Sequence, residues 1–272
     1  MRLPVSAGAV RKLLKEIESS AAGEHVLAVG GAPELAPLLR QQLLRGRAEP
    51  GAVCLGDPEG ADVYVHVLDG EPDDVDVAAL RRARRARVPV VAVARGRARA
   101  PAPIPYVLAT DVVWMSGADG YPLGAIAETI AARLGERGAP LAARVPLIRE
   151  AVCRELVASF SRRNGLFAAA IWIPGADLPV LTLAELRLVS RLAQAYGLDS
   201  GRDLVPELAA TLGAAFGLRA LARELLDLVP VAGWAVKGTL AYAGTRALGE
   251  AACKRFALAA TPPRAAASPG AP

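Results

Sequence analysis

The chain has 272 residues and a net charge of +5, and 53% of its residues are hydrophobic while only 4% are aromatic. This length is sufficient for two domains, whose cores must consist mainly of Ala, Leu and Val. Cys54, Cys153 and Cys253 are odd in number and lack a Cys-x-x-Cys spacing, which argues against a disulfide framework and a zinc site. The composition therefore predicts a protein of a reducing, cytoplasmic compartment.

The first stretch of the chain is amphipathic. Val10, Leu13, Leu14 and Ile17 lie at helical spacing, and charged residues lie largely between them. Charges recur from Arg11 onward, so the apolar core of a signal peptide is not expected here. We expect a short helix that packs on the unit that follows it in the chain.

Apolar segments then alternate with helical segments. The apolar run His25 to Val29 ends at Gly30 and Gly31 and leads into a helix expected over 34–44. Further strands are expected over 52–55, 63–68, 88–93 and 105–108, and further helices over 75–87 and 123–134. Buried apolar strands that alternate with helices predict a parallel sheet covered on its faces, so residues 1–140 are expected to form an α/β domain.

This order of elements resembles a shortened P-loop GTPase of the Era type. In that family Gly-x-x-x-x-Gly-Lys-Ser/Thr surrounds the phosphates with backbone amides, the lysine binds the outer phosphates, and the hydroxyl binds magnesium. The corresponding triplet here is Ala36-Pro37-Leu38, or Leu35-Ala36-Pro37 in the other register. Neither contains the lysine or the hydroxyl, and Pro33 and Pro37 each lack an amide donor.

Two further motifs of that family are weak or missing. Asp57-Pro58-Glu59-Gly60 has the Asp-x-x-Gly form of the magnesium and γ-phosphate switch, although an ordinary turn explains so short a match better. Ala94-Arg95-Gly96-Arg97 stands where Asn-Lys-x-Asp would select guanine, and it contains no carboxylate. The resemblance thus implies a vestigial nucleotide site at Gly30, Gly31, Asp57 and Gly60, with no bound cofactor, no metal and no catalytic residue.

Charged and titratable residues elsewhere in this half suggest no second site. The arginines of segment 81–87, with Arg95, Arg97 and Arg99, could contact phosphate or lipid headgroups. Because no aromatic residues are interleaved with them, a solvated helix face is favoured and no nucleic acid is expected as a partner. His25 and His66 have no Cys, Asp or Glu at a ligand spacing, so both are interpreted as structural.

The second half is expected to be helical. Gly138-Ala139-Pro140, at the start of a segment that runs to Arg144, predicts a hinge between the two domains. Beyond it, Ile148, Val152, Leu156 and Phe160 recur every four residues and predict a helix that docks on the following domain.

From Leu166 to Phe256 the chain resembles the family known as domain of unknown function 697, a helical module often attached to Era-like GTPase domains. The resemblance rests on Pro174, Gly175, Asp177, Pro179, Leu181, Thr182, Tyr196-Gly197, Pro230, Gly233 and Thr245-Arg246-Ala247-Leu248-Gly249. It implies a helical domain over residues 141–258, followed by a Pro- and Ala-rich tail over 259–272 that is expected to be disordered.

The residues themselves also predict helices here. Thr182 and Glu185 have the spacing of a capping box, so a helix is expected to begin there and to stop at Gly197. Its polar face would carry Arg187, Ser190, Arg191 and Gln194. Ser200 and Asp203 are expected to open the next helix, which is expected to be buried because it carries no charge over 208–218. A leucine-striped helix is expected over 218–228, and then a last helix whose Gly233, Gly238, Gly244 and Gly249 let helix backbones approach closely.

Membrane contact is considered because small residues also pack membrane helices. The longest charge-free run, residues 164–176, is shorter than the roughly 20 residues that a span requires. A helical bundle with peripheral or re-entrant membrane contact is therefore favoured over a spanning helix.

The sequence as a whole predicts a non-catalytic interaction protein. In this interpretation a GTPase-like half presents a helical module to a protein partner or a membrane surface. Two alternatives stay open: a GTP-binding switch that uses unconventional contacts at Gly30, Gly31 and Asp57, and an integral membrane component. No partner, pathway or oligomeric state is assigned by the sequence.

Overall fold

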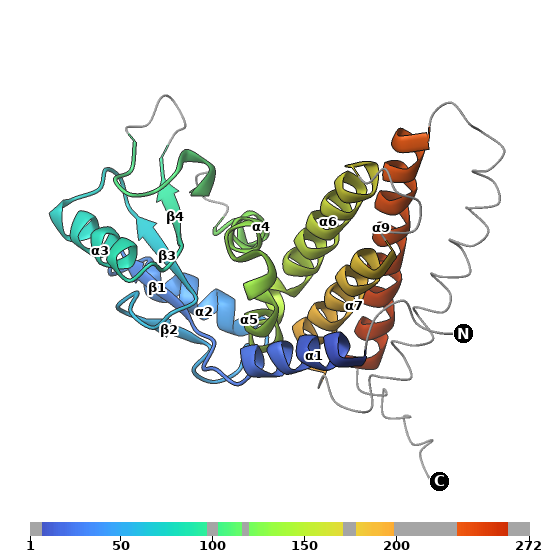
Figure 1. Cartoon of the computed structure of the whole chain (residues 1–272). Helices are drawn as coiled ribbons and strands as arrows, with labels where there is room; N and C mark the ends of the chain where they lie inside the picture. The colour runs from blue at the N-terminus through green and yellow to red at the C-terminus, as the bar shows by residue number, and fades with distance from the viewer. Residues whose placement is uncertain (1–6, 97–102, 116–119, 171–177, 199–232, 261–272) are drawn as a thin grey trace, which may run out of the picture.

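The computed structural model describes residues 7–96, 103–115, 120–170, 178–198 and 233–260. In these residues a five-stranded parallel sheet lies at one side of the molecule and long helices lie at the other (Figure 1). The protein is thus a mixed α/β structure with an additional helical part. Several predictions fall outside the described residues: the helix opened by Ser200 and Asp203, the helix over 218–228, and the family positions Pro174, Gly175, Asp177 and Pro230. Of the tail predicted over 259–272, residues 261–272 also lie outside them, and Ala259 and Ala260 belong to the last helix.

All strands of the sheet are parallel, and their order is β2-β1-β3-β4-β5. The strands are β1 (Leu27–Gly31), β2 (Val53–Leu55), β3 (Val63–Leu68), β4 (Val90–Arg95) and β5 (Val112–Met115). Every residue of β3 is buried, which is typical of a strand covered on both faces; Val63, Val65 and Val67 lie on one face, and Tyr64, His66 and Leu68 on the other.

Helices cover both faces of the sheet. On one face, α2 (Ala36–Arg45) and α4 (Leu123–Leu134) contribute buried side chains to the largest hydrophobic cluster. On the other face, α3 (Asp74–Arg85) packs through Leu80 and Ala83. The sheet is therefore doubly wound, with a strand order common in such folds.

The last strand is not where the sequence places it. Residues 105–108, expected as a strand, instead lead through a turn into the short 3-10 helix η1 (Ala109–Asp111), and β5 begins at Val112. Pro105 has no amide to donate to a sheet, and Leu108 is 59% exposed. The strand prediction over 105–108 is wrong because, of this run, only Val107 packs against the hydrophobic cluster on this face of the sheet, and it does so as part of a loop.

The segment predicted as a hinge is also structured. A short 3-10 helix, η2 (Gly135–Arg137), leads into α5 (Gly138–Arg144), in which Gly138 to Ala142 are buried. Pro140 is accommodated because the first turn of a helix does not need its amide. One hydrophobic cluster continues from Val65 in the sheet through Leu141 to Leu188 in the helical half, so the segment predicted as a hinge is a buried helix within this cluster.

The helical part consists of α6 (Pro146–Ala170), α7 (Leu178–Ala195) and α9 (Gly233–Ala260). The expected stripe on α6 is confirmed, since Ile148, Val152, Leu156 and Phe160 are each at most 2% exposed. In the part of the chain that the structure describes, no helix has both the length and the apolarity needed to cross a membrane.

Helix α7 begins earlier than predicted. It starts at Leu178, so Thr182 and Glu185 lie inside the helix and are buried, and the capping-box prediction is wrong. The capping box that forms is at α3, where Asp73 and Asp76 each accept the other's backbone amide. The predicted stop is confirmed: Gly197 has φ 72°, and the amide of Leu198 donates to the carbonyl of Ala193.

The first helix, α1 (Ala7–Ala21), packs on α7 instead of on the unit that follows it. Arg187 pairs with Glu16 at 2.7 Å, and Arg191 donates to the hydroxyl of Ser20 at 2.6 Å. The polar face predicted for α7 is therefore largely covered by α1, with Ser190, Arg191 and Gln194 at most 6% exposed. Side chains that looked solvated in the sequence serve to attach the N-terminal helix.

Glycines allow α6 and α9 to approach closely. A Cβ on Gly165 would lie 3.1 Å from the carbonyl oxygen of Gly238, and one on Gly238 would lie 3.0 Å from that of Gly165. A Cβ on Gly249 would lie 2.6 Å from Val157, whereas one on Gly244 would meet no heavy atom within 4 Å. The prediction of close approach is confirmed for Gly238 and Gly249 and is wrong for Gly244; the surroundings of Gly233 are not described.

Candidate functional site

The carboxyl ends of β1 and β3 are the place where a doubly wound sheet binds ligands. These strands are neighbours, and the helices that follow them, α2 and α3, lie on opposite faces of the sheet. Such a reversal opens a crevice beyond the strand ends. Gly30 and Gly31 lie here, paired in register with His66 and Val67.

The turn after β1 is filled by its own backbone. The amide of Ala32 donates to the carbonyl of Val67 at 2.8 Å, and the amides of Leu35 and Ala36 both donate to the carbonyl of Ala32. Gly31 has φ 97°, and a Cβ there would collide with the Val67 carbonyl. The amides of Ala32, Leu35 and Ala36, three donors of this turn, are thus already engaged.

The other predicted positions lie nearby but have their own partners. Asp57 forms an ion pair with Arg82 of α3 at 2.9 Å, and the two side chains are 63% and 49% exposed. Gly60 has φ 81° and open space around it, as expected of an ordinary turn. Arg95, at the expected base-reading position, pairs with Asp69 at 3.0 Å.

A buried relay of polar side chains lies beneath this edge of the sheet. His66 is 1% exposed; its Nε2 lies 2.8 Å from Oδ1 of Asp76, and its Nδ1 lies 3.0 Å from the hydroxyl of Tyr64. Since a carboxylate can only accept, Nε2 carries the proton and donates to Asp76, while Nδ1 accepts from Tyr64. The phenol end of Tyr64 lies against Gly30, so the relay connects the capping box of α3 to the glycine turn.

Burial controls the protonation of the relay. It lowers the pKa of His66 below its ordinary value, although the hydrogen bond and charge of Asp76 oppose this shift. Burial likewise raises the pKa of Tyr64 to about 12; the charge of Arg82 opposes this shift, and the charges of Asp57 and Asp76 add to it. Both groups are therefore neutral at pH 7.

Both histidines have carboxylate partners, contrary to the sequence-based expectation. His25 Nδ1 lies 3.1 Å from Asp62, and His25 Nε2 lies 2.8 Å from the carbonyl of Ser20. Asp62 lies 37 residues from His25, and Asp76 lies 10 residues from His66. These separations are longer than the short spacings of metal-binding motifs, so a search for such motifs does not find the pairs. The Asp73-x-x-Asp76 pattern was a usable signal for the second pair, because a capping box fixes where Asp76 lies.

The shifted pKa of His66 predicts a pH-dependent stability. Below about pH 6.5 the unfolded chain protonates this histidine while the folded protein does not. The free energy of unfolding is therefore expected to decrease as the pH falls from about 6.5 toward the lower pKa of the folded state, by at most roughly 1.4 kcal/mol per pH unit.

Urea denaturation at several pH values between about 5.5 and about 7.5 measures this decrease. The His66→Gln variant is expected to have a flatter pH profile, whereas the matched His25→Gln variant keeps the decrease. Equal slopes in the wild-type protein and His66→Gln would contradict this prediction.

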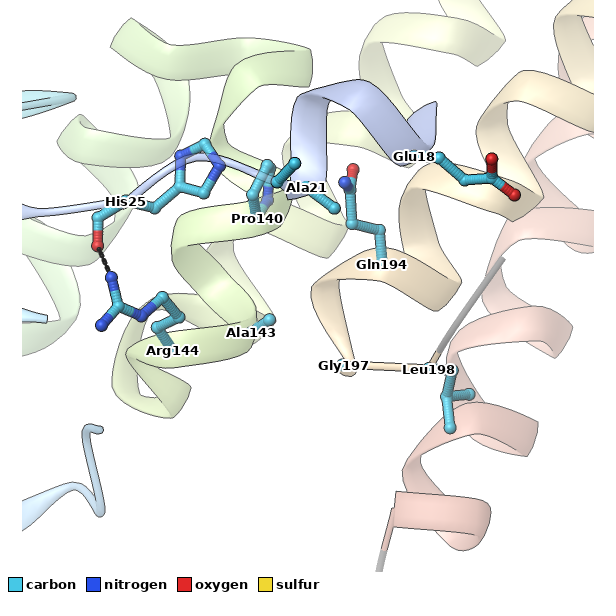
Figure 2. Close-up of a pocket in the computed structure, with 10 residues that line it drawn as sticks. Glu18, Ala21, His25, Pro140, Ala143, Arg144, Gln194, Gly197 and Leu198 are labelled. Carbon is cyan, nitrogen blue, oxygen red and sulfur yellow. Dashed lines mark hydrogen bonds between the residues drawn. The ribbon is translucent and has the colours of Figure 1, made fainter. Parts of the chain in front are cut away.

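A pocket of about 330 Å³ lies among α1, α5 and the end of α7. Figure 2 shows His25 and Arg144 near one another and Gln194 projecting from α7. Arg144 donates to the carbonyl of His25 at 2.7 Å and to Glu49 at 2.9 Å, and Gln194 accepts from Arg191. Arg144 and Gln194 thus already form hydrogen bonds within the protein. Neither side chain is left without a partner to hold a ligand in this pocket.

Two of the three cysteines meet in space although they are 100 residues apart. Cys153 on α6 and Cys253 on α9 are both free thiols and form a side-chain hydrogen bond. This hydrogen bond and burial raise the pKa of Cys153. A thiol reacts as its thiolate, so Cys153 is unreactive at neutral pH.

One residue of the helical resemblance, Thr245, lies where three helices meet. Asn164 on α6 donates to the hydroxyl of Thr245 at 3.0 Å, and that hydroxyl donates to Glu185 on α7 at 3.4 Å. Thr245 is fully buried, and Glu185 is 1% exposed. Thr245 of the resemblance therefore connects α6, α7 and α9 through a buried polar cluster with Asn164 and Glu185.

Within the described ranges, no group of His, Cys, Asp and Glu side chains is arranged to hold a metal ion. Compared with family models, with curated proteins and with solved structures, the chain gives no match in any of the three.

Proposed function

We propose that this chain is a non-catalytic interaction protein, in which a degenerate GTPase-like α/β half presents a helical module related to the domain of unknown function 697. The partner is a protein or a membrane surface, contacted from the cytoplasm. The observation that carries the proposal is the turn after β1, whose amides donate to Val67 and Ala32 instead of facing an open crevice.

Electrostatics at the same edge supports this proposal. A triphosphate needs cations and a metal ligand that face it. Asp57, the residue nearest to a magnesium ligand in the sequence pattern, is paired with Arg82, and Arg95 is paired with Asp69. Binding a nucleotide here would require breaking both ion pairs and the hydrogen bond of Ala32.

Titration of the purified chain with fluorescent GTP, GDP and ATP tests the proposal, with an active P-loop GTPase as the positive control. We expect no saturable binding and no phosphate release. Saturable binding that is lost in Asp57→Asn and kept in the matched variant Glu59→Gln would establish the GTP-binding switch instead.

Carbonate extraction of cell membranes tests the remaining alternative. A peripheral or unattached protein is released into the supernatant by this treatment. Retention in the membrane pellet would show an integral component and would contradict the proposal.

A further inference from the structure

The outward face of α3 carries opposite charges at its two ends. Four exposed residues recur at the spacing of one helical stripe: Asp74, Ala78, Arg81 and Arg85. This stripe lies opposite the buried residues Leu80 and Ala83. An acid and a base thus lie about 16 Å apart on one exposed face, with Ala78 and Arg81 between them.

The basic end has more charge than the helix itself requires. In the described structure Arg82 pairs with Asp57, while Arg81, Arg84 and Arg85 form no ion pair with a carboxylate. Cations three and four residues apart on a helix repel each other, and the helix dipole offsets only part of this cost. The basic end therefore favours a partner that brings negative charge.

An aromatic side chain that is distant in sequence orders part of this end. Tyr106, with φ 66°, accepts a hydrogen bond from Nε of Arg81 at 3.2 Å, and the guanidinium of Arg84 lies 5.4 Å from the centre of its ring. These contacts hold Arg81 and Arg84 beside Tyr106. Arg85 makes neither of these contacts with Tyr106, and its exposed side chain provides the positive charge at this end of the stripe.

The sheet beneath α3 is incompletely covered. Val107, Val112 and Trp114 pack against the hydrophobic cluster on this face but are only partly buried. On the opposite face, α2 and α4 pack together with the helical part. An additional protein surface on the α3 side would bury more of these side chains.

We propose that two copies of this chain pair through α3 in antiparallel orientation. A two-fold axis near the middle of the helix places Asp74 opposite Arg85 of the second copy, and Arg85 opposite its Asp74. The axis then lies between Ala78 and Arg81, so Ala78 of each copy faces Arg81 of the other, and its small side chain leaves room for that arginine. The pairing is independent of whether the chain binds a nucleotide.

The charge pattern selects this occupant over a polyanion. A nucleic acid or an anionic bilayer has charge of one sign and would be repelled by Asp74 and the neighbouring Asp73. A second copy, running in the opposite direction, presents both signs in the complementary order. The occupant is therefore a second α3.

Sedimentation velocity of the full chain at increasing concentration tests this pairing with three variants. Asp74→Arg and Arg85→Asp each create two repulsive pairs, so each alone is expected to weaken dimerisation by about tenfold or more. An equimolar mixture of these two variants makes both pairs attractive again, so a mixed dimer is expected. Lys254→Asp, on the exposed side of α9, changes the net charge equally and is expected to leave the dimer unchanged.

Three results would overturn the proposal. These are a monomeric wild-type chain at all concentrations, failure of the mixture to restore the dimer while circular dichroism shows both variants folded, and equal weakening by Lys254→Asp. The last would indicate dependence on total charge alone. Binding of the chain to single-stranded oligonucleotides or anionic vesicles that Asp74→Arg strengthens and Arg85→Asp abolishes would assign this face to a polyanion instead.

Discussion

Replacing Gly165 by leucine is expected to lower the free energy of unfolding by roughly 3 kcal/mol or more, because the new side chain must push α6 and α9 apart. The first atom of that side chain would already lie 3.1 Å from the carbonyl oxygen of Gly238 and 3.1 Å from Cβ of Tyr242. A backbone carbonyl on a packed helix cannot rotate away as a side chain can. Urea denaturation followed by circular dichroism measures the loss.

Gly244→Leu is the matched control on α9. A Cβ at Gly244 meets no heavy atom within 4 Å, so the substitution removes a glycine from a helix without a steric clash. It is expected to leave stability unchanged or to raise it by up to about 1 kcal/mol through helix propensity. Similar losses in both variants would show that the Gly165–Gly238 approach does not determine how these helices pack.

Replacing Asp76 by alanine is expected to destabilise the protein by roughly 2–4 kcal/mol, because one carboxylate makes two separate contributions. Its Oδ2 accepts the backbone amide of Asp73 and completes the capping box of α3. Its Oδ1 accepts from Nε2 of His66, a donor that is buried and would be left without this acceptor. Chemical denaturation at pH 7 measures the change.

Asp74→Ala is the control for Asp76→Ala. It removes a negative charge from the first turn of α3 but leaves the capping box and the hydrogen bond to His66 in place. Asp74 is exposed and belongs to the same first turn, so its loss is expected to cost only a few tenths of a kcal/mol. Asp76→Asn retains an oxygen acceptor and is expected to lie between the two. If Asp76→Ala cost no more than Asp74→Ala, the relay would contribute nothing to stability.

The α/β half was largely readable in the sequence because buried strands and amphipathic helices each have a short period. The run from Val63 to Leu68 is apolar except for Tyr64 and His66, and it forms β3, in which every residue is buried. The apolar pattern gave a wrong prediction where apolar residues belong to a loop and not to a strand. Residues 105–108 are apolar in composition but form a loop, because Pro105 cannot donate to a neighbouring strand and Leu108 faces solvent.

The candidate site was only half predictable. The sequence alone shows that no lysine, serine or threonine follows Gly31 in this turn. The hydrogen bond from the Ala32 amide to the Val67 carbonyl could not be predicted, because it forms only when β1 and β3 pair. The pairs His66–Asp76 and His25–Asp62 were missed for the same reason, since their members are brought together by the sheet and by α3.

Local chemistry was therefore enough to identify helices, buried strands, the stop at Gly197 and the absence of a lysine and a hydroxyl in the turn after Gly31, since each depends on neighbours within a few positions. Which surfaces are buried was decided by long-range packing. The polar residues Arg187, Arg191 and Gln194 resemble a solvated face in sequence but hold α1, because its partner side chains are about 170 residues away. The sequence shows which residues share one face of a helix, but it does not show which other element packs against that face.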